Sequence, residues 1–161
     1  MFDIDLTKSV MGTATIAINK PVAEVFDFVA VNFFENYPKW APEVVEFEPL
    51  NGSSVEVGAQ ARQLRYDQTQ EAETILQVTT FEPEKQLVLE AVTGEFRDSY
   101  DFENCSDLES TKLTFRFEML HLDVFMRPFA KLIKVAIEEG VTNSLENVKN
   151  LIIHEENVAE I

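Results

Sequence analysis

The spacing of hydrophobic residues changes once along this chain, and that change limits the folds open to it. Between residues 44 and 119 apolar side chains alternate with polar ones, most regularly from Leu113 to Met119. From residue 125 to 152 they recur every three or four positions. A period of two is typical of strands with one buried face, whereas a period near 3.6 is typical of an amphipathic helix. The sequence therefore predicts several strands followed by one long helix.

Two shorter helices are expected near the N-terminus, after a first strand at Thr13–Ile18. Asn19 is a suitable helix cap, and Pro21 suits an early helical position. Apolar residues at helical spacing follow and predict a short amphipathic helix. A second short helix or irregular turn is expected at Phe33–Trp40, ended by Pro42.

About six later strands are joined by short connections, which favour an antiparallel sheet. They are expected at residues 44–50, 62–66, 74–80, 87–91, 96–102 and 113–119. A sheet with one apolar face needs a cover, and the long helix supplies it. Because a twisted sheet does not touch a straight helix everywhere, a gap lined by Phe, Leu, Val and Met side chains is expected between them. Pro128 either lies in the first turn of the helix or kinks it, and the tail after His154 is expected to fray.

The length of 161 residues suits a single domain covering residues 1–161, with a core at about 10–153. Acidic residues outnumber basic ones by 29 to 13, which gives a net charge of −16. Nucleic-acid binding requires clustered Lys and Arg, so this balance argues against it. An anionic membrane surface is expected to repel the chain for the same reason. The acidic excess is interpreted as a solvated surface that favours solubility.

The ends and the cysteine content bear on the compartment. Met1–Asp5 is acidic where a secretory signal is basic, and no apolar run approaches the ~20 residues of a transmembrane helix. Cys105 is the sole cysteine, which excludes an intramolecular disulfide. We therefore expect a cytoplasmic protein without stable membrane insertion.

Several segments together resemble one known superfamily, the START-like or helix-grip group, also called polyketide cyclase/dehydrase and lipid transport (SRPBCC). The segments that carry the resemblance are Ile16–Phe26, Tyr37–Val44, Val57-Gly58 with Val78–Pro83, and Ser110–Thr114 followed by the C-terminal helix. The last departs slightly, because the family usually has Gly-Thr where this chain has Ser110-Thr111.

The resemblance implies an α+β fold in which a curved antiparallel sheet wraps around a long C-terminal helix, with two short helices after the first strand. It also implies an internal cavity for a small hydrophobic molecule such as a lipid, isoprenoid, quinone or polyketide-like compound. One alternative is a polyketide cyclase or dehydratase that uses polar cavity residues. Another is a non-catalytic interaction module, able to form a homodimer through a sheet edge or helix. No cofactor is expected, and no spaced His and Cys set predicts a metal site.

Asp98 is the most informative polar residue, because alternation places it on the same inward face as Phe96 and Tyr100. Unpaired there, its pKa should rise, and it would orient a ligand or move a proton. The alternative is a structural group near solvent at the strand end. Arg62, in register with Leu64, is expected on an apolar face, as a partner for Asp98, a ligand contact or a rim residue.

Other candidates have equally open roles. Tyr66 and Tyr100 either bond a ligand oxygen or pack in the core. His121 is either a base at the cavity mouth or structural. Gly140 and Ser144 interrupt the apolar stripe of the long helix, which leaves room for a ligand or permits close packing.

Together these residues form the expected site. The catalytic candidates are Asp98, Arg62 and His121. The residues expected to bind the ligand are Trp40, Arg62, Leu64, Tyr66, Leu76, Val78, Leu89, Asp98, Tyr100, Phe115, Phe117, Gly140 and Ser144. Cys105 is expected to be a non-catalytic thiol.

Overall fold

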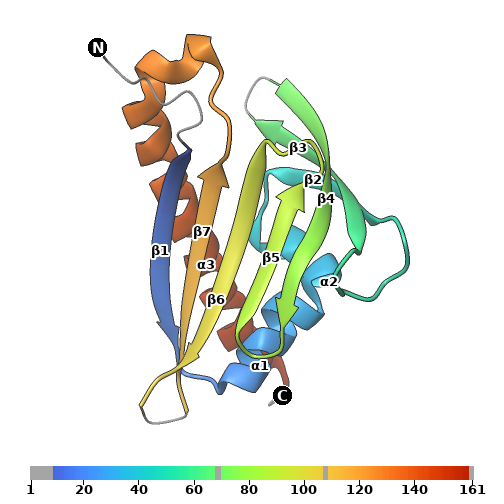
Figure 1. The fold of residues 1–161 in the computed structure, drawn as a ribbon. Helices are drawn as coiled ribbons and strands as arrows, with labels where there is room; N and C mark the ends of the chain where they lie inside the picture. The colour runs from blue at the N-terminus through green and yellow to red at the C-terminus, as the bar shows by residue number, and fades with distance from the viewer. Residues whose placement is uncertain (1–8, 68–69, 107–108, 160–161) are drawn as a thin grey trace.

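The computed structural model describes residues 9–67, 70–106 and 109–159. The acidic segment Met1–Asp5 lies outside these residues, and so do the side chains of the tail beyond His154. Within the described part of the chain, a curved sheet lies against one long helix and encloses shorter helices (Figure 1).

Seven antiparallel strands in the described residues form one sheet, in the order β1-β7-β6-β5-β4-β3-β2. The strands are β1 (Val10–Ile18), β2 (Val44–Pro49), β3 (Gln60–Asp67), β4 (Gln70–Glu82), β5 (Gln86–Ala91), β6 (Phe96–Asn104) and β7 (Thr111–Met119). Because the first strand pairs with the last, β1 and β2 are the two edges of the sheet.

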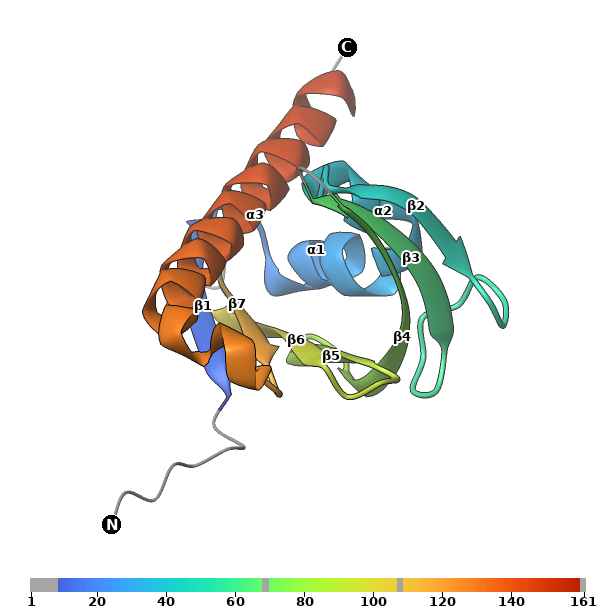
Figure 2. The same cartoon turned by 90° about the horizontal axis from the view of Figure 1, so that it is seen from above.

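The helices lie on the inner side of this sheet. They are α1 (Val22–Phe26), the π-helical turn η1 (Asp27–Val31), α2 (Phe33–Trp40), the 3-10 turn η2 (Val124–Phe129) and α3 (Ala130–Ala159). Figure 2 shows α1 and α2 inside the curve of the sheet and α3 passing over the β1 side. The α+β helix-grip architecture expected from the sequence is therefore confirmed.

The long helix begins later than the apolar spacing predicts. Residues of η2 form a 3-10 turn, and regular α-helix starts only at Ala130. Asp123 caps the turn, because its Oδ1 accepts a hydrogen bond of 3.1 Å from the amide of Phe125. Pro128 lies inside this turn, where its missing amide donor does not interrupt an α-helical hydrogen-bond ladder. The expectation that the helix starts at Phe125 is therefore wrong.

Phe33 of α2 holds the short helices in the curve of the sheet. Its ring stacks on Tyr37 with centroids 4.6 Å apart and meets the rings of Trp40 at 5.8 Å and Tyr100 at 6.0 Å. Tyr100 in turn stacks on Phe115 of β7 at 4.4 Å. Aromatic pairs at such distances contribute ~0.5–1.5 kcal/mol each beyond their buried area. This aromatic cluster fixes α2 against β6 and β7.

Helix α3 approaches the sheet very closely at Gly12 of β1. A Cβ atom at this position would lie 2.6 Å from Cγ2 of Ile137 and 2.9 Å from the backbone nitrogen of Glu138. These distances are shorter than van der Waals contact, so glycine alone fits without moving the helix. Farther along the helix, the buried residues are Val141, Leu145, Val148 and Ile152.

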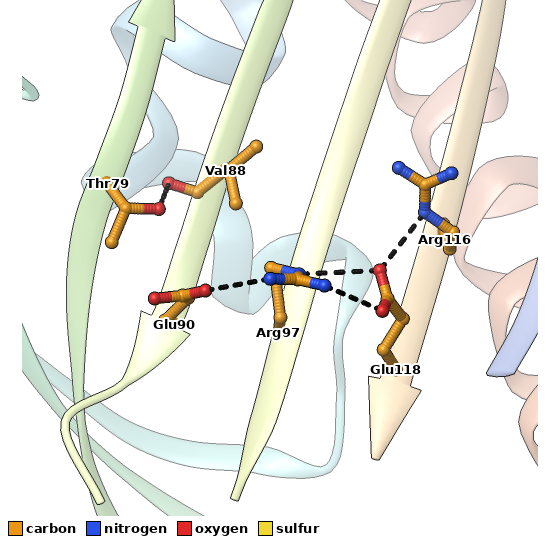
Figure 3. A network of polar contacts seen from close by, with 6 residues as sticks. All are labelled: Thr79, Val88, Glu90, Arg97, Arg116 and Glu118. Carbon is orange, nitrogen blue, oxygen red and sulfur yellow. Dashed lines mark hydrogen bonds and ion pairs between the residues drawn. The ribbon is translucent and has the colours of Figure 1, made fainter. Parts of the chain in front are cut away.

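The outer face of the sheet carries a network of ion pairs (Figure 3). Arg97 of β6 lies 3.1 Å from Glu90 of β5 and 2.8 Å from Glu118 of β7. Arg116 approaches the same Glu118 carboxylate at 3.3 Å. Partly exposed pairs of this kind each stabilise the fold only slightly. They do identify the outward positions of β6, so the alternate residues, including Asp98, point inward.

We expect Gly12→Ala to lower the free energy of unfolding by ~1–3 kcal/mol, the usual cost of overpacking, because the new methyl group collides with backbone as well as with Ile137. Gly140→Ala is the matched change, since its Cβ would meet nothing within 4 Å. In that position Ala is favoured over Gly by ~1 kcal/mol through helix propensity. Urea denaturation followed by circular dichroism measures both variants. A Gly12→Ala protein as stable as the wild type would contradict the close contact.

Candidate functional site

A cavity of about 320 Å³ lies between α3, the end of α2 and the inner face of the sheet. The larger lining residues that carry polar atoms in their side chains are Tyr37, Trp40, Glu43, Arg65, Asp98 and Tyr100. Its apolar lining residues are Phe115, Phe117, Ile133, Ala136, Ile137 and Val141, and small side chains are supplied by Ala41, Gly140 and Ser144. The lining of the cavity therefore combines polar and apolar side chains, and the register of β6 and β7 places Asp98 beside Phe117 and Tyr100 beside Phe115.

The apolar part of the lining follows directly from the periods of the two elements that build it. Phe115 and Phe117 are two residues apart in β7, so both rings leave the same face of the sheet. Ile133, Ile137 and Val141 are four residues apart in α3, so they form one stripe on the helix. The aliphatic side chains of this stripe on α3 and the two Phe rings of β7 together form the apolar walls of the cavity.

The polar part of the lining contains three buried polar atoms that have no hydrogen-bond partner among the described residues. They are Oδ1 of Asp98, Oη of Tyr100 and Nε1 of Trp40. Asp98 is only 3% exposed, and the other two side chains are at most 1% exposed. A buried polar group without a partner costs roughly 1–3 kcal/mol, so folding alone gives no reason to place three of them on one wall.

Burial changes the ionisation of these groups. It raises the pKa of Asp98 to about 7, while Arg65 opposes the rise and Glu43 adds to it. Burial likewise raises the pKa of the Tyr100 hydroxyl well above its ordinary value, and the Asp98 carboxylate contributes to this. The nearby indole of Trp40 opposes the rise in the pKa of Tyr100, although the two groups do not meet the geometry of a hydrogen bond. Near neutral pH, Asp98 therefore exists both as an acid that donates a hydrogen bond and as a carboxylate that accepts one.

The rim of the cavity is held by polar contacts between α2, β3 and the turn after α2. Arg65 Nη2 donates to Glu43 Oε1 at 3.1 Å, and both side chains are about one-third exposed. The Tyr37 hydroxyl donates to Oε1 of the buried Gln63 at 3.2 Å. The Arg65–Glu43 ion pair is partly exposed, so it lies on the side of the cavity that is open to solvent.

The structure places seven of the sequence-predicted ligand residues in the wall of the cavity. These are Trp40, Asp98, Tyr100, Phe115, Phe117, Gly140 and Ser144. Gly140 has open space where its side chain would be, as expected for a position that leaves room for a ligand. Their role in binding stays a prediction.

Arg62, Leu64 and Tyr66 do not face the cavity, so their expected orientation is wrong. Arg62 pairs with Glu46 at 3.0 Å and Glu73 at 3.2 Å on the outer face of the sheet. Leu64 and Tyr66 alternate with buried Gln63 and therefore share this outer face. The error arises because alternation separates the two faces of a strand without saying which one is inner. Arg62 is consequently not the partner of Asp98.

Leu76, Val78 and Leu89 point inward but do not line the cavity. They are fully buried in the core cluster that also contains Val29 and Phe33 from the short helices. The short helices fill this part of the curved sheet, so these residues pack against protein. They therefore do not form part of the wall of this cavity, where the sequence predicts them.

His121 is exposed and lies outside the cavity that contains Asp98. It borders a second hollow of about 460 Å³ under η2, together with Phe96, Met119 and Met126. Phe117 lines both spaces, so its ring forms part of the wall between them. Phe96 stacks on this ring with centroids 5.4 Å apart.

Sequence reasoning missed Tyr37, Glu43 and Arg65 as cavity residues. Tyr37 had a detectable signal, because it lies three residues before Trp40 in a predicted helix and so shares its face. Arg65 lies two residues after Gln63, on the face of β3 opposite to the face that the sequence predicts to be apolar and inner. The remaining missed residues, Ala41, Ile133, Ala136, Ile137 and Val141, come from the turn after α2 and from α3.

No group of three or more His, Cys, Asp or Glu side chains in the described residues is arranged to bind a metal ion. Cys105 is a free, half-buried thiol after the end of β6. Among the described helices, none is long and apolar enough to cross a membrane.

Comparison with known proteins gives one family. A family profile described as polyketide cyclase / dehydrase and lipid transport matches residues 10–152 of the chain. A search of curated protein sequences finds no match.

Several solved structures share the fold at low sequence identity. A protein from Thermus thermophilus has a TM-score of 0.69 at 15% identity, over 90% of this chain and 98% of that one. A point mutant of norcoclaurine synthase from a Thalictrum species, in complex with a transition-state analogue, has a TM-score of 0.71 at 12% identity, over 93% and 98%. Major latex-like protein 151 from Panax ginseng has a TM-score of 0.61 at 14% identity, over 86% and 95%. These likenesses show the fold alone.

The raised pKa of Asp98 predicts a particular pH dependence of stability. The folded protein binds this proton at a pKa of about 7, against an ordinary value of 3.8, so folding favours the protonated form. The penalty is absent below about pH 4, grows as the pH rises toward 7 and is constant above it. Relative to the wild type, Asp98→Asn should therefore gain stability across this interval, by roughly 4 kcal/mol in all.

Urea denaturation at pH 4, 5.5 and 8 measures this difference. Asp101→Asn is the control, because Asp101 lies on the outer face of the same strand and accepts a hydrogen bond from Gln86 at 2.7 Å. This control measures what an Asp→Asn change on the same strand does to stability outside the cavity. An Asp98→Asn difference that does not change with pH would show that Asp98 titrates normally.

Proposed function

The chain belongs to the polyketide cyclase/dehydrase and lipid transport family, and from that premise we propose that it binds a small hydrophobic molecule with one hydrogen-bonding end in the cavity beneath α3. Membership of this family implies a hydrophobic ligand held in a cavity. The finer proposal concerns the chemistry of the ligand and its orientation.

The observation that carries the proposal is the set of unpartnered atoms of Trp40, Tyr100 and Asp98 in the lining of a cavity whose other walls are apolar. The indole N–H and the phenol O–H both donate hydrogen bonds, and the Asp98 oxygen accepts one. A ligand hydroxyl, or a carbonyl beside an N–H or O–H group, would satisfy all three. The apolar body of the ligand would then lie along Phe115, Phe117 and the stripe of α3.

The size of the cavity restricts the ligand further. At about 320 Å³ it is close to the lower end of the roughly 300–1,000 Å³ typical of small-molecule sites. That volume favours a compact ring system or a short isoprenoid over a long-chain lipid. An open cavity of this size also counts against the alternative of a plain interaction module, for which a filled interior is expected.

Binding of the neutral probe N-phenyl-1-naphthylamine tests this proposal, because the probe is aromatic and carries one N–H donor. The wild type should bind it with enhanced fluorescence. Gly140→Leu should weaken binding by about tenfold or more, because the added side chain enters the open space at Gly140 and overpacking costs ~1–3 kcal/mol. Gly140→Ala is the control and should bind nearly as well as the wild type.

Two results would contradict the proposal. One is the absence of probe binding by a folded wild-type protein, and the other is equal binding by the wild type and Gly140→Leu. Native mass spectrometry of freshly purified protein adds a direct search for a copurified small molecule.

Proton transfer is a second candidate function, favoured by the pKa of Asp98 near 7 inside an apolar cavity. A general base is most effective when its pKa lies near the working pH. In this family context, the reaction would be a cyclisation or dehydration of a polyketide-like substrate, with Asp98 as the group that takes or returns the proton. No second acid or base within the cavity is required for this step.

The probe substrate 5-nitrobenzisoxazole tests the ability of Asp98 to remove a proton. The carboxylate takes the ring C–H proton, the N–O bond breaks, and the coloured cyanophenolate forms. The rate should rise with pH with a midpoint near 7 and fall to background in Asp98→Asn. A rate that survives in Asp98→Asn would assign the activity to another group.

A further inference from the structure

The surface formed by η2 and the first turns of α3 is unusually apolar for an exposed region. Phe125 is 84% exposed and Leu132 is 69% exposed. The other exposed apolar residues of this surface are Val124, Met126, Phe129 and Val135. Large exposed apolar residues gathered on one segment mark an interaction surface. This group of six residues is called the apolar surface below.

The charge of this segment is opposite to that of the rest of the chain. Residues 124–137 contain three basic residues, Arg127, Lys131 and Lys134, and all 29 acidic residues of the chain lie outside them. Asp123 and Glu138 flank the segment. Lys134 lies 3.9 Å from Glu138, but both side chains are about half exposed or more, and such a pair is worth little. An exposed segment that is both basic and apolar is complementary to a partner that is both anionic and apolar.

We propose that the apolar surface docks peripherally on an anionic lipid bilayer, with Phe125 and Leu132 entering the headgroup region and the side chains of Lys131 and Lys134 facing lipid phosphates. Amphipathic helical segments with basic residues beside large apolar ones bind such interfaces without crossing them. A second copy of the chain is less suitable, because a two-fold contact through this surface brings the basic residues of both copies together.

The net charge of −16 does not prevent this docking. At physiological ionic strength the Debye length is ~8 Å, so acidic groups on distant faces are largely screened from the membrane. The nearest charges decide the interaction, and on this segment they are basic. The expectation that an anionic membrane repels this chain rests on the net charge of the whole sequence and assumes an even spread of charge. Residues 124–137 do not fit that assumption, because they contain basic residues and no acidic ones.

The same segment also lines the cavity. Ile133, Ala136 and Ile137 face the space beneath α3, while Leu132 and Val135 face outward from the same helical turns. A bilayer in contact with Leu132 therefore lies one helix width from the cavity. Docking would bring the cavity close to the hydrocarbon interior of the bilayer, where hydrophobic molecules are concentrated.

Sedimentation with vesicles of phosphatidylcholine and phosphatidylglycerol tests the proposal in the full chain. The wild type should sediment with these anionic vesicles, less with pure phosphatidylcholine vesicles, and less as salt is raised. Lys131→Gln combined with Lys134→Gln should weaken binding about 30-fold, because each basic residue near an anionic surface contributes about fivefold. The charge-matched control is Lys85→Gln with Lys112→Gln, in which both lysines are exposed on other parts of the molecule.

A second pair of variants tests the apolar contribution. Phe125→Ser with Leu132→Ser should abolish sedimentation, whereas Val45→Ser with Val57→Ser, which are 55% and 63% exposed elsewhere, should not. Both variants should still bind N-phenyl-1-naphthylamine, so a failure of docking is distinguishable from a failure of the cavity proposal. Absence of wild-type sedimentation, or sedimentation unchanged by both surface variants, would overturn the proposal. A dimer in solution that Phe125→Ser with Leu132→Ser dissociates would overturn it in favour of a second copy.

Discussion

The contact between Gly12 of β1 and Ile137 of α3 determines how the long helix lies on the sheet. Because position 12 has no side chain, the helix backbone approaches the edge strand closely. A curved sheet and a nearly straight helix that touch at one edge must separate toward the middle of the sheet. The cavity beneath α3 is therefore a geometric result of where the helix is anchored.

The short helices determine how much of that separation remains open. Phe33 and its neighbouring rings fill the part of the sheet that contains Leu76 and Leu89. What remains is bounded by Trp40 and Tyr100 at the edge of this aromatic cluster. Each of these two residues contributes its ring to the core and its polar atom to the cavity. The residues that stabilise the fold and those that would contact a ligand are thus partly the same.

The fold could be predicted from sequence because period and turn signals are local, whereas the site depends on which face of each strand is inner. On β6 the aromatic residues Phe96 and Tyr100 identified the inner face, so Asp98 was located in the cavity. On β3 the apolar residues Leu64 and Tyr66 lie outside, and Gln63 and the cavity residue Arg65 lie inside. A strand beside a partly polar cavity reverses the usual pattern. Pro128 lies within the 3-10 turn that precedes α3, and apolar spacing alone does not distinguish such a turn from α-helix.

The ring of Phe117 stands between the cavity and the hollow under η2. On one side it stacks on Phe96, with ring centroids 5.4 Å apart. The torsion angles of this one side chain therefore set how the space beneath α3 is divided from the hollow under η2.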